Sequence, residues 1–183
     1  PLVALRDSIG GVYFSGLITN TGEATLQYPK VVVKLFDEEG TVVAEGYGYG
    51  TRDYLLPGEE SIVRVLISNA PDYYRFTTAT ELKEISSLSK IERANIEISE
   101  TKMNFSAYSR LDISGVVTNR DKRVCRLIKI ESLVYKNGAI AGSGLKLLVQ
   151  DLAPGASLPF SMYITSSLDS ADSMVLDYQA SFK

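Results

Sequence analysis

Two tyrosines occupy the positions best suited to binding in this sequence of 183 residues. Residues 46–50 read Gly-Tyr-Gly-Tyr-Gly, and on a β-strand Tyr47 and Tyr49 would share one face while the glycines share the other. Their rings could form a flat platform for a sugar or a peptide, with Arg52 and Tyr54 beside them. The alternative is that the rings cover the end of a small core. Exposed tyrosines would favour binding, and buried ones a core role.

Two charged segments are further candidates for ligand contact. The carboxylates of residues 37–39 (Asp-Glu-Glu) are of the kind that binds calcium, but they lack Asp-x-Asp-x-Asp spacing and are also typical of a solvated hairpin turn. Residues 120–123 (Arg-Asp-Lys-Arg), with Arg126, form a basic loop that would suit an anionic polymer, an anionic head group or an acidic domain face, or would simply be solvated. We therefore predict no metal site.

Catalytic arrangements are scarce in this composition. The chain has no histidine and one cysteine, Cys125, so histidine-assisted nucleophiles and internal disulfides are excluded. The Cys125 thiol is expected to be a buried small hydrophobic group. Ser87 and Lys90 show Ser-x-x-Lys spacing, but within an expected linker. We expect no enzyme activity, no catalytic residues and no cofactor.

An internal repeat organises the chain. Three landmarks return in the same order after 97 to 99 residues, a spacing that suits a tandem pair of small domains. The matching segments are 14–20 with 113–119, 40–44 with 138–142, and 56–59 with 153–156.

Each copy reads as short strands separated by turns. Residues 31–36 and 41–49 predict a hairpin through Gly40, and Asn137-Gly138 predicts the matching hairpin of the second copy, because both residue types tolerate positive φ. Each Pro-Gly pair, at 57–58 and at 154–155, fits the centre of a type II turn. Further strands are expected at 12–14, 17–19, 61–67, 76–82, 128–130, 133–135, 158–164 and 174–182.

No sustained helical pattern competes with these strands. Residues 81–91 come closest, but their serine-rich centre is a poor helix former, so we interpret them as the interdomain connection. The sequence therefore predicts an all-β protein made of two tandem immunoglobulin-like β-sandwich domains, residues 1–87 and 88–183.

The order of these landmarks resembles the FxLYD-type domain. The chain shows a strand with Gly-x-x-x-Asn, the segment Val-Lys-Leu-Phe-Asp at 33–37, then Val-Val and Leu-x-Pro-Gly, with a looser Leu-Val-Tyr-Lys at 133–136. The resemblance covers nearly the whole chain as two copies. It implies an immunoglobulin-like β-sandwich of bacterial and archaeal envelope proteins, without established catalytic residues.

These observations favour a non-enzymatic module outside the cytoplasm or at the cell surface, acting as a spacer or a protein-interaction segment. The alternative is a carbohydrate- or peptide-binding module that uses the tyrosine-rich surface of copy one. The expected partner is another protein or a surface glycan. The net charge of −3 argues against nucleic acid, and no stretch is apolar enough to span a membrane. Residues 1–87 are the more acidic half, with 7 Lys and Arg against 12 Asp and Glu, which favours neutral or cationic partners.

Overall fold

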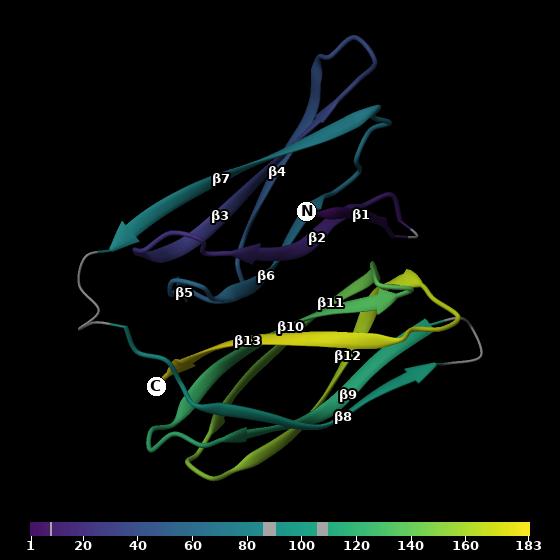
Figure 1. Cartoon of the computed structure of the whole chain (residues 1–183). Coiled ribbons are helices and arrows are strands. Elements are labelled where there is room, and N and C mark those ends of the chain that lie inside the picture. The colour runs from purple at the N-terminus through teal and green to yellow at the C-terminus, as the bar shows by residue number, and fades with distance from the viewer. Residues whose placement is uncertain (8, 86–90, 106–109) are drawn as a thin grey trace. The chain divides into compact units, whose positions relative to one another are not determined.

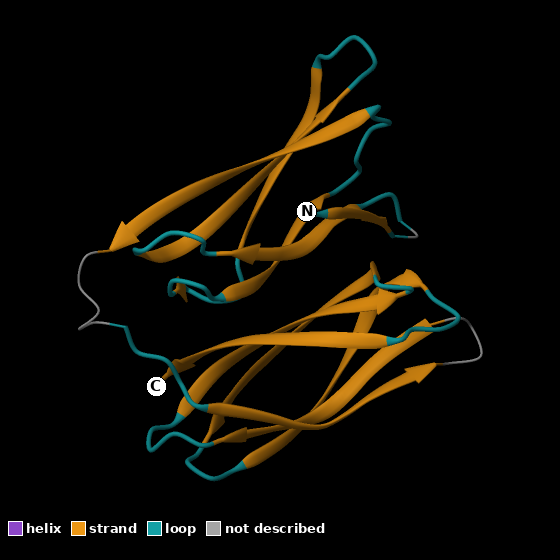
Figure 2. Ribbon diagram, viewed as in Figure 1, coloured by secondary structure: helices purple, strands orange, loops and turns teal. Residues whose placement is uncertain are grey.

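The computed structural model describes residues 1–7, 9–85, 91–105 and 110–183 (Figure 1). Every regular element in this part of the chain is a β-strand, and Figure 2 shows only strands and the loops between them. The all-β prediction is therefore confirmed for the described residues. The strands are β1 (Val3–Arg6), β2 (Val12–Thr19), β3 (Thr25–Phe36), β4 (Val42–Tyr49), β5 (Tyr54–Leu55), β6 (Glu60–Ile67), β7 (Arg75–Ile85), β8 (Ile96–Phe105), β9 (Arg110–Asn119), β10 (Cys125–Lys136), β11 (Ala139–Leu152), β12 (Ser157–Ser167) and β13 (Ser173–Phe182).

The chain divides into two compact units, Pro1–Lys90 (unit 1) and Ile91–Lys183 (unit 2). The expected boundary between residues 87 and 88 lies outside the described residues, as do Ser87 and Lys90 with their Ser-x-x-Lys spacing.

Part of the expected interdomain connection is wrong. Strand β7 continues to Ile85, so residues 81–85 pair with β3 instead of forming a linker. Six of residues 77–84 are polar, and all eight are exposed in the fold. Because neither face of this strand is buried, its sequence lacks the apolar alternation that marks a strand.

Unit 1 contains two antiparallel sheets around one core. In the first sheet β2 lies between β1 and β6, and in the second β3 pairs with β4 and β5 along one edge and with β7 along the other. Side chains alternate along β3, so Val31, Val33 and Leu35 are buried. The core of unit 1 consists of Val12, Phe14, Val31, Val33, Leu35, Val63, Val65 and Ile67.

Unit 2 forms one curled six-stranded sheet in the order β13-β10-β11-β12-β9-β8. Strand β12 pairs with β9 along most of its length and with β11 at two positions, which joins the two halves of the sheet. The core between these halves includes Ala94, Ile96, Leu111, Ile113, Val117, Cys125, Ile128, Ile130, Val134, Leu148, Leu152, Phe160, Met162, Ile164, Leu168 and Ala180.

A buried asparagine, Asn20, fastens three segments of unit 1. Its Nδ2 donates to the carbonyls of Ala24 (2.8 Å) and Leu55 (2.9 Å), and its Oδ1 accepts from the backbone N–H of Gly22 (3.1 Å). Its own carbonyl accepts from the N–H of Gly58, the glycine of the Pro-Gly turn (2.8 Å). The end of β2, the following loop and the turn before β6 are thus held together.

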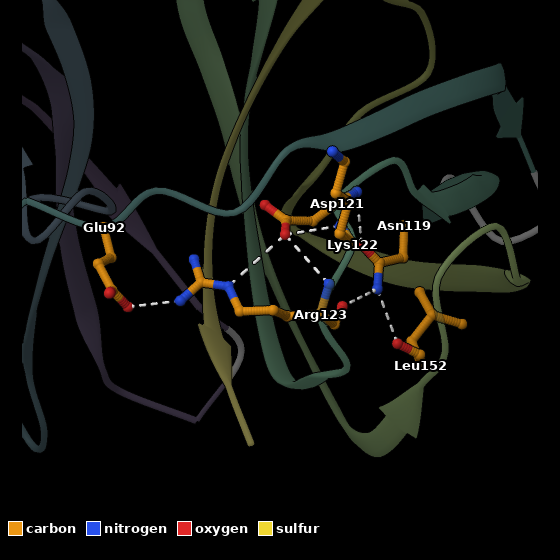
Figure 3. Close-up of polar contacts among 6 residues, drawn as sticks. All are labelled: Glu92, Asn119, Asp121, Lys122, Arg123 and Leu152. Atoms are coloured by element: carbon orange, nitrogen blue, oxygen red, sulfur yellow. Dashed lines mark hydrogen bonds and ion pairs between the residues drawn. The ribbon is translucent and has the colours of Figure 1, made fainter.

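Asn119 makes the same bonds in unit 2 (Figure 3). Its Nδ2 donates to the carbonyls of Arg123 and Leu152, both at 2.8 Å, and its Oδ1 accepts from the N–H of Asp121 (2.9 Å). Its carbonyl accepts from the N–H of Gly155 (2.8 Å). The two landmarks Gly-x-x-x-Asn and Pro-Gly recur together because the asparagine of one binds the glycine of the other.

The predicted turn geometry is confirmed. Gly40 and Gly138 have φ values of +84° and +75°, and Asn137 has +52°, which is the pattern of a tight hairpin turn. In unit 1 the N–H of Glu59 donates to the carbonyl of Leu56 (3.0 Å) and closes the Pro-Gly turn.

We predict that Asn20→Ala or Asn119→Ala lowers the free energy of unfolding by about 2 to 4 kcal/mol, because each change leaves buried backbone groups without partners. Urea unfolding of the full chain measures the loss. The control is Asn104→Ala, since Asn104 lies exposed on β8 and makes one hydrogen bond, to Ser114. Equal, small losses for all three variants would contradict the fastening role of Asn20 and Asn119.

We also predict that Gly40→Val or Gly138→Val costs about 1 kcal/mol or more. A Cβ at either position would meet no atom within 4 Å, so the cost comes from backbone strain alone. Thermal unfolding of the two variants measures it. A loss near zero at both positions would show that these turns tolerate an ordinary side chain.

Candidate functional site

The tyrosines of β4 lie on its solvent-facing side. Tyr47 is opposite Val32, and Tyr49 is opposite Lys30, on the face of β3 that points away from the core. Tyr47 is 61% exposed and Tyr49 49% exposed. Their ring centroids are 6.0 Å apart with an interplanar angle of 83°. The expectation of a flat two-ring platform is therefore wrong, because the rings meet edge to face.

Lys30 contributes a cation to this surface. Its Nζ lies 4.6 Å from the centroid of the Tyr47 ring, within cation–π range, and forms an ion pair of 2.9 Å with Glu81 of β7. The hydrogen bond to Glu81 raises the pKa of Lys30, and the charge of Glu81 and the nearby hydroxyls of Tyr47 and Tyr49 act in the same direction. We refer to Lys30, Tyr47 and Tyr49 as the tyrosine face.

Gly46 and Gly48, which alternate with the tyrosines along β4, face the other sheet. A Cβ at Gly48 would collide with the backbone carbonyl of Arg64 on β6, and one at Gly46 would lie 2.8 Å from Cγ1 of Ile67. The sequence left open whether the other sheet, the neighbouring domain or an external chain packs on this side. For Gly46 and Gly48 it is the other sheet of the same unit. Because β4 crosses β6 so closely, its larger side chains must point outward.

Tyr54 and Arg52 lie in a different setting. Tyr54 is on β5 opposite Gln27, whose Nε2 donates to the Tyr54 hydroxyl (3.3 Å), and its ring centroid is 6.1 Å from that of Tyr28. Arg52 forms an ion pair with Glu59 at 3.6 Å. The four residues selected from the sequence therefore fall into three groups. Tyr47 and Tyr49 lie together, Tyr54 lies beside Tyr28, and Arg52 pairs with Glu59.

Two residues of these groups were missed in the sequence. Lys30 was missed because a register shift between Leu35 and Phe36 places it beside Tyr49, whereas a regular count back from the turn would place Pro29 there. Tyr28 was missed because it has a positive φ of 48°, which breaks the alternation that sequence reasoning relies on. The charge of Asp53 is the main cause that raises the pKa of Tyr28, and burial and Tyr54 add to it.

The matching strand of unit 2 also points apolar side chains outward. Leu145 and Leu147 occupy the positions equivalent to the two tyrosines, and they are 41% and 49% exposed. Val149, on the same face, is 75% exposed. Because side chains alternate along the strand, both leucines point away from the core of unit 2.

Two of the basic residues in the loop of unit 2 form ion pairs with acids (Figure 3). Arg123 forms ion pairs with Glu92 (2.8 Å) and Asp121 (3.7 Å), and Arg120 forms one with Glu97 (2.6 Å). Partial burial would raise the pKa of Asp121, but backbone N–H groups of Arg123 and Lys122 outweigh it, so the pKa is lowered and the carboxylate stays charged. Arg120 and Arg123 thus bind this unit's own acids, which weakens the case for an anionic polymer.

Two other candidates offer little chemistry. Cys125 is fully buried, and burial raises the pKa of its thiol, so the reactive thiolate is disfavoured. The described residues contain no group of three or more His, Cys, Asp or Glu side chains placed to hold a metal ion. Among the described residues there is also no helix with the length and apolar character needed to cross a membrane.

We predict that substitutions on the two faces of β4 destabilise unit 1 to different extents. Gly48→Ala lowers the free energy of unfolding by about 1 to 3 kcal/mol, because backbone must move to admit the Cβ. Tyr47→Ser lowers it by only about 0.5 to 1 kcal/mol, the size of a lost exposed ring contact. The control is Gly22→Ala, where the nearest atom to a new Cβ is Asn20 Oδ1 at 3.5 Å. Urea unfolding ranks the three, and a larger loss for Tyr47→Ser would place that ring in the core.

No family model matches the chain, and no curated protein does. Among solved structures, the chain is similar to a glycosyl hydrolase family 2 member from Bacteroides cellulosilyticus, at 12% identity and a TM-score of 0.31, over 94% of this chain and 28% of that one. It is similar to a β-glucuronidase of glycoside hydrolase family 2, at 12% identity and a TM-score of 0.27, over 89% and 21%. It is also similar to Bacteroides uniformis β-glucuronidase 2, at 15% identity and a TM-score of 0.25, over 91% and 22%. The chain spans less than a third of each, and similarities this weak carry no argument about its function.

Proposed function

We propose that the chain is a non-enzymatic tandem module of two immunoglobulin-like β-sandwich domains that binds another protein outside the cytoplasm. One observation carries the proposal: equivalent strands of both units present exposed non-polar side chains. In unit 1 these are Tyr47 and Tyr49, and in unit 2 they are Leu145 and Leu147. Apolar and aromatic groups on a sheet face stabilise a protein contact when a partner covers them.

The domain type, the location at the cell envelope and the independent folding of the two halves belong to the same proposal. The FxLYD-type resemblance supports the immunoglobulin-like domain type and a location at the cell envelope. The near-complete repeat supports independent folding of residues 1–87 and 88–183, because each half holds its own core cluster. A module of this kind also separates the chain segments or domains on either side of it, which is the spacer role.

The tyrosine face suits a peptide or protein better than a sugar. The rings are perpendicular, so a sugar ring would stack on one tyrosine only, whereas a protein surface could contact both rings. Lys30 beside Tyr47 and its ion pair with Glu81 add polar groups to the rim of the apolar centre, as in protein interfaces. Carbohydrate binding is the second candidate, because the exposed face of the Tyr47 ring remains available for stacking.

The test compares matched variants of the full chain on peptide, protein and glycan arrays. We expect Tyr47→Ser/Tyr49→Ser to lose binding to protein or peptide targets by about tenfold or more, which corresponds to about 1.4 kcal/mol. Tyr74→Ser is the control, because Tyr74 is also a highly exposed tyrosine of unit 1, at 73%. Equal loss in both variants would contradict the proposed site. Binding to glycans alone would favour the second candidate.

A further inference from the structure

The hairpin between β10 and β11 ends in an Asn-Gly turn at the surface of unit 2. Lys136 pairs with Ala139, so Asn137 and Gly138 alone form the loop, and both are exposed. Their φ values of +52° and +75° place both residues in the left-handed region. The chain contains six asparagines, and Asn137 is the only one that a glycine follows. This pair of residues therefore has a chemistry that the other asparagines share only in part.

An asparagine can lose its side-chain amide to its own backbone. The backbone nitrogen of the next residue attacks Cγ, a new C–N bond closes a cyclic succinimide, and the side-chain amide leaves with the proton of that nitrogen as ammonia. Water then opens the ring at either carbonyl and leaves aspartate or isoaspartate, the second with an extra carbon atom in the main chain. The attack needs a side-chain amide that can rotate and a backbone nitrogen that is neither crowded nor hydrogen-bonded.

Asn137 meets both needs. Its side-chain amide makes no hydrogen bond to any described residue, and its polar contact runs from the backbone N–H to the carboxylate of Asp172. The N–H of Gly138 lies outside the β10–β11 ladder and donates to no backbone group in the described part of the chain. A Cβ at Gly138 would meet no atom within 4 Å, so the space around this nitrogen is open.

Three of the other asparagines are held by hydrogen bonds. Asn20 and Asn119 each engage their side-chain amides in three of them. Asn69 has the same left-handed backbone as Asn137, with a φ of +49°. The nitrogen that follows Asn69, however, is that of Ala70, which donates to the carbonyl of Gly10 (3.1 Å). None of these three combines a rotating amide with an available nitrogen.

The two asparagines of the β8 region are restrained as well. The nitrogen that follows Asn95 is that of Ile96, which donates to the hydroxyl of Tyr178 (3.4 Å). Asn104 donates its side-chain amide to Oγ of Ser114 (2.9 Å), and the bulky Phe105 follows it at the end of β8. The fold thus sets Asn137 apart from every other asparagine of the chain.

The turn is fastened to the loop between β12 and β13. The N–H of Asn137 donates to Asp172, the N–H of Asp172 donates to the carbonyl of Tyr135 (2.8 Å), and Nζ of Lys136 forms an ion pair of 2.6 Å with Asp169. A carboxylate at position 137 would repel the carboxylate of Asp172 that accepts the N–H of the same residue. Isoaspartate would lengthen a loop of two residues. Either product therefore loosens this fastening.

We propose that Asn137 of the folded chain is converted to aspartate and isoaspartate, without an enzyme, through attack by the backbone nitrogen of Gly138. The conversion adds one negative charge and loosens the hairpin tip of unit 2. The equivalent hairpin of unit 1 turns through residues 37–40 (Asp-Glu-Glu-Gly) and contains no asparagine, so unit 1 is not altered in this way. This modification site goes beyond the proposed binding role and does not depend on it.

The test follows the full chain during incubation at physiological temperature and mildly alkaline pH. Trypsin releases residues 137–146 as one peptide, because no Lys or Arg lies between Lys136 and Lys146. Mass spectrometry detects the small mass gain when the amide becomes a carboxylate, and a fresh sample digested alongside corrects for conversion during digestion. We expect Asn137 to convert at least about tenfold faster than Asn69 or Asn104 in the folded chain.

Variants separate the chemical step from the opening of the turn. Gly138→Ala should slow the conversion by about tenfold, because its Cβ crowds the attacking nitrogen. Asp172→Ala should speed the conversion by about threefold, because it releases the backbone of Asn137. The control is Asp151→Ala, which removes another exposed carboxylate of unit 2, one that pairs with Lys183, and it should leave the rate unchanged.

A second set of variants tests the consequence of the conversion. Asn137→Asp introduces the charge of one product without changing the main chain, and it should lower the melting temperature more at low salt than at high salt. Combining it with Asp172→Asn should remove this salt-dependent loss, because the repulsion then has no second partner. A melting temperature of Asn137→Asp equal to that of the unchanged chain at low salt would contradict the loosening of the tip.

Three results would overturn the proposed modification site. One is an unchanged Asn137 in the folded chain under conditions that convert it in the chain unfolded by urea. Another is conversion of Asn69 or Asn104 at the same rate as Asn137. The third is an Asp172→Ala variant that converts no faster than the unchanged chain, because the fastening of the turn would then have no influence on the reaction.

Discussion

The buried asparagine at the end of β2 and of β9 is the constraint on which the rest of each unit depends. Asn20 and Asn119 each satisfy two carbonyls and one N–H in buried or partly buried places. An unpaired buried backbone group is costly, so these loops are tied to one geometry. That geometry sets where the Pro-Gly turn and the following core strand begin. In unit 1 this side chain ties β2 of one sheet to β5 of the other, and in unit 2 it ties β9 to the end of β11 within the single curled sheet.

A second constraint follows from how closely the sheets of unit 1 approach. Because β4 passes over the backbone of β6 at Gly48, only a residue without a Cβ fits on the inner side. The outer side then carries the larger side chains of that strand, and the inner side carries only the small Ala44, Gly46 and Gly48 over the core. The exposed tyrosines are thus in part a consequence of packing, and in unit 2 the equivalent outward positions hold Leu145 and Leu147. The outward direction belongs to the shared fold, whereas the aromatic character belongs to unit 1 alone.

Local signals in the sequence were sufficient to predict much of the fold. The Gly40 and Asn137-Gly138 hairpins were predictable because turn chemistry and register are set by neighbouring residues. The sequence did not indicate which side of the sheet Leu145 and Leu147 occupy, because an apolar residue on a strand is compatible with either side. The sequence also did not show that the Tyr47 and Tyr49 rings are perpendicular, since ring orientation is set by side-chain torsions and by neighbours on other strands, such as Lys30 over the Tyr47 ring. Strand β7 beyond residue 82 was missed because polar side chains cover both of its faces.

The two units differ most where the fold constrains them least. Both keep the asparagine, the turns and the inner valines and isoleucines, which fix the sheets. At the β8 edge, unit 2 combines Tyr178, Phe182 and two arginines to hold a strand of its own. Unit 1 has threonine, glutamate, threonine and alanine at those four positions. Each replacement removes either apolar contact area or an ion-pair partner for an acidic strand, so all four changes act in the same direction. The four differences lie on one edge of the repeat, beside the asparagine and the Pro-Gly turn that both units keep, so the polar contacts that fix the fold are shared while the contacts of this edge are not.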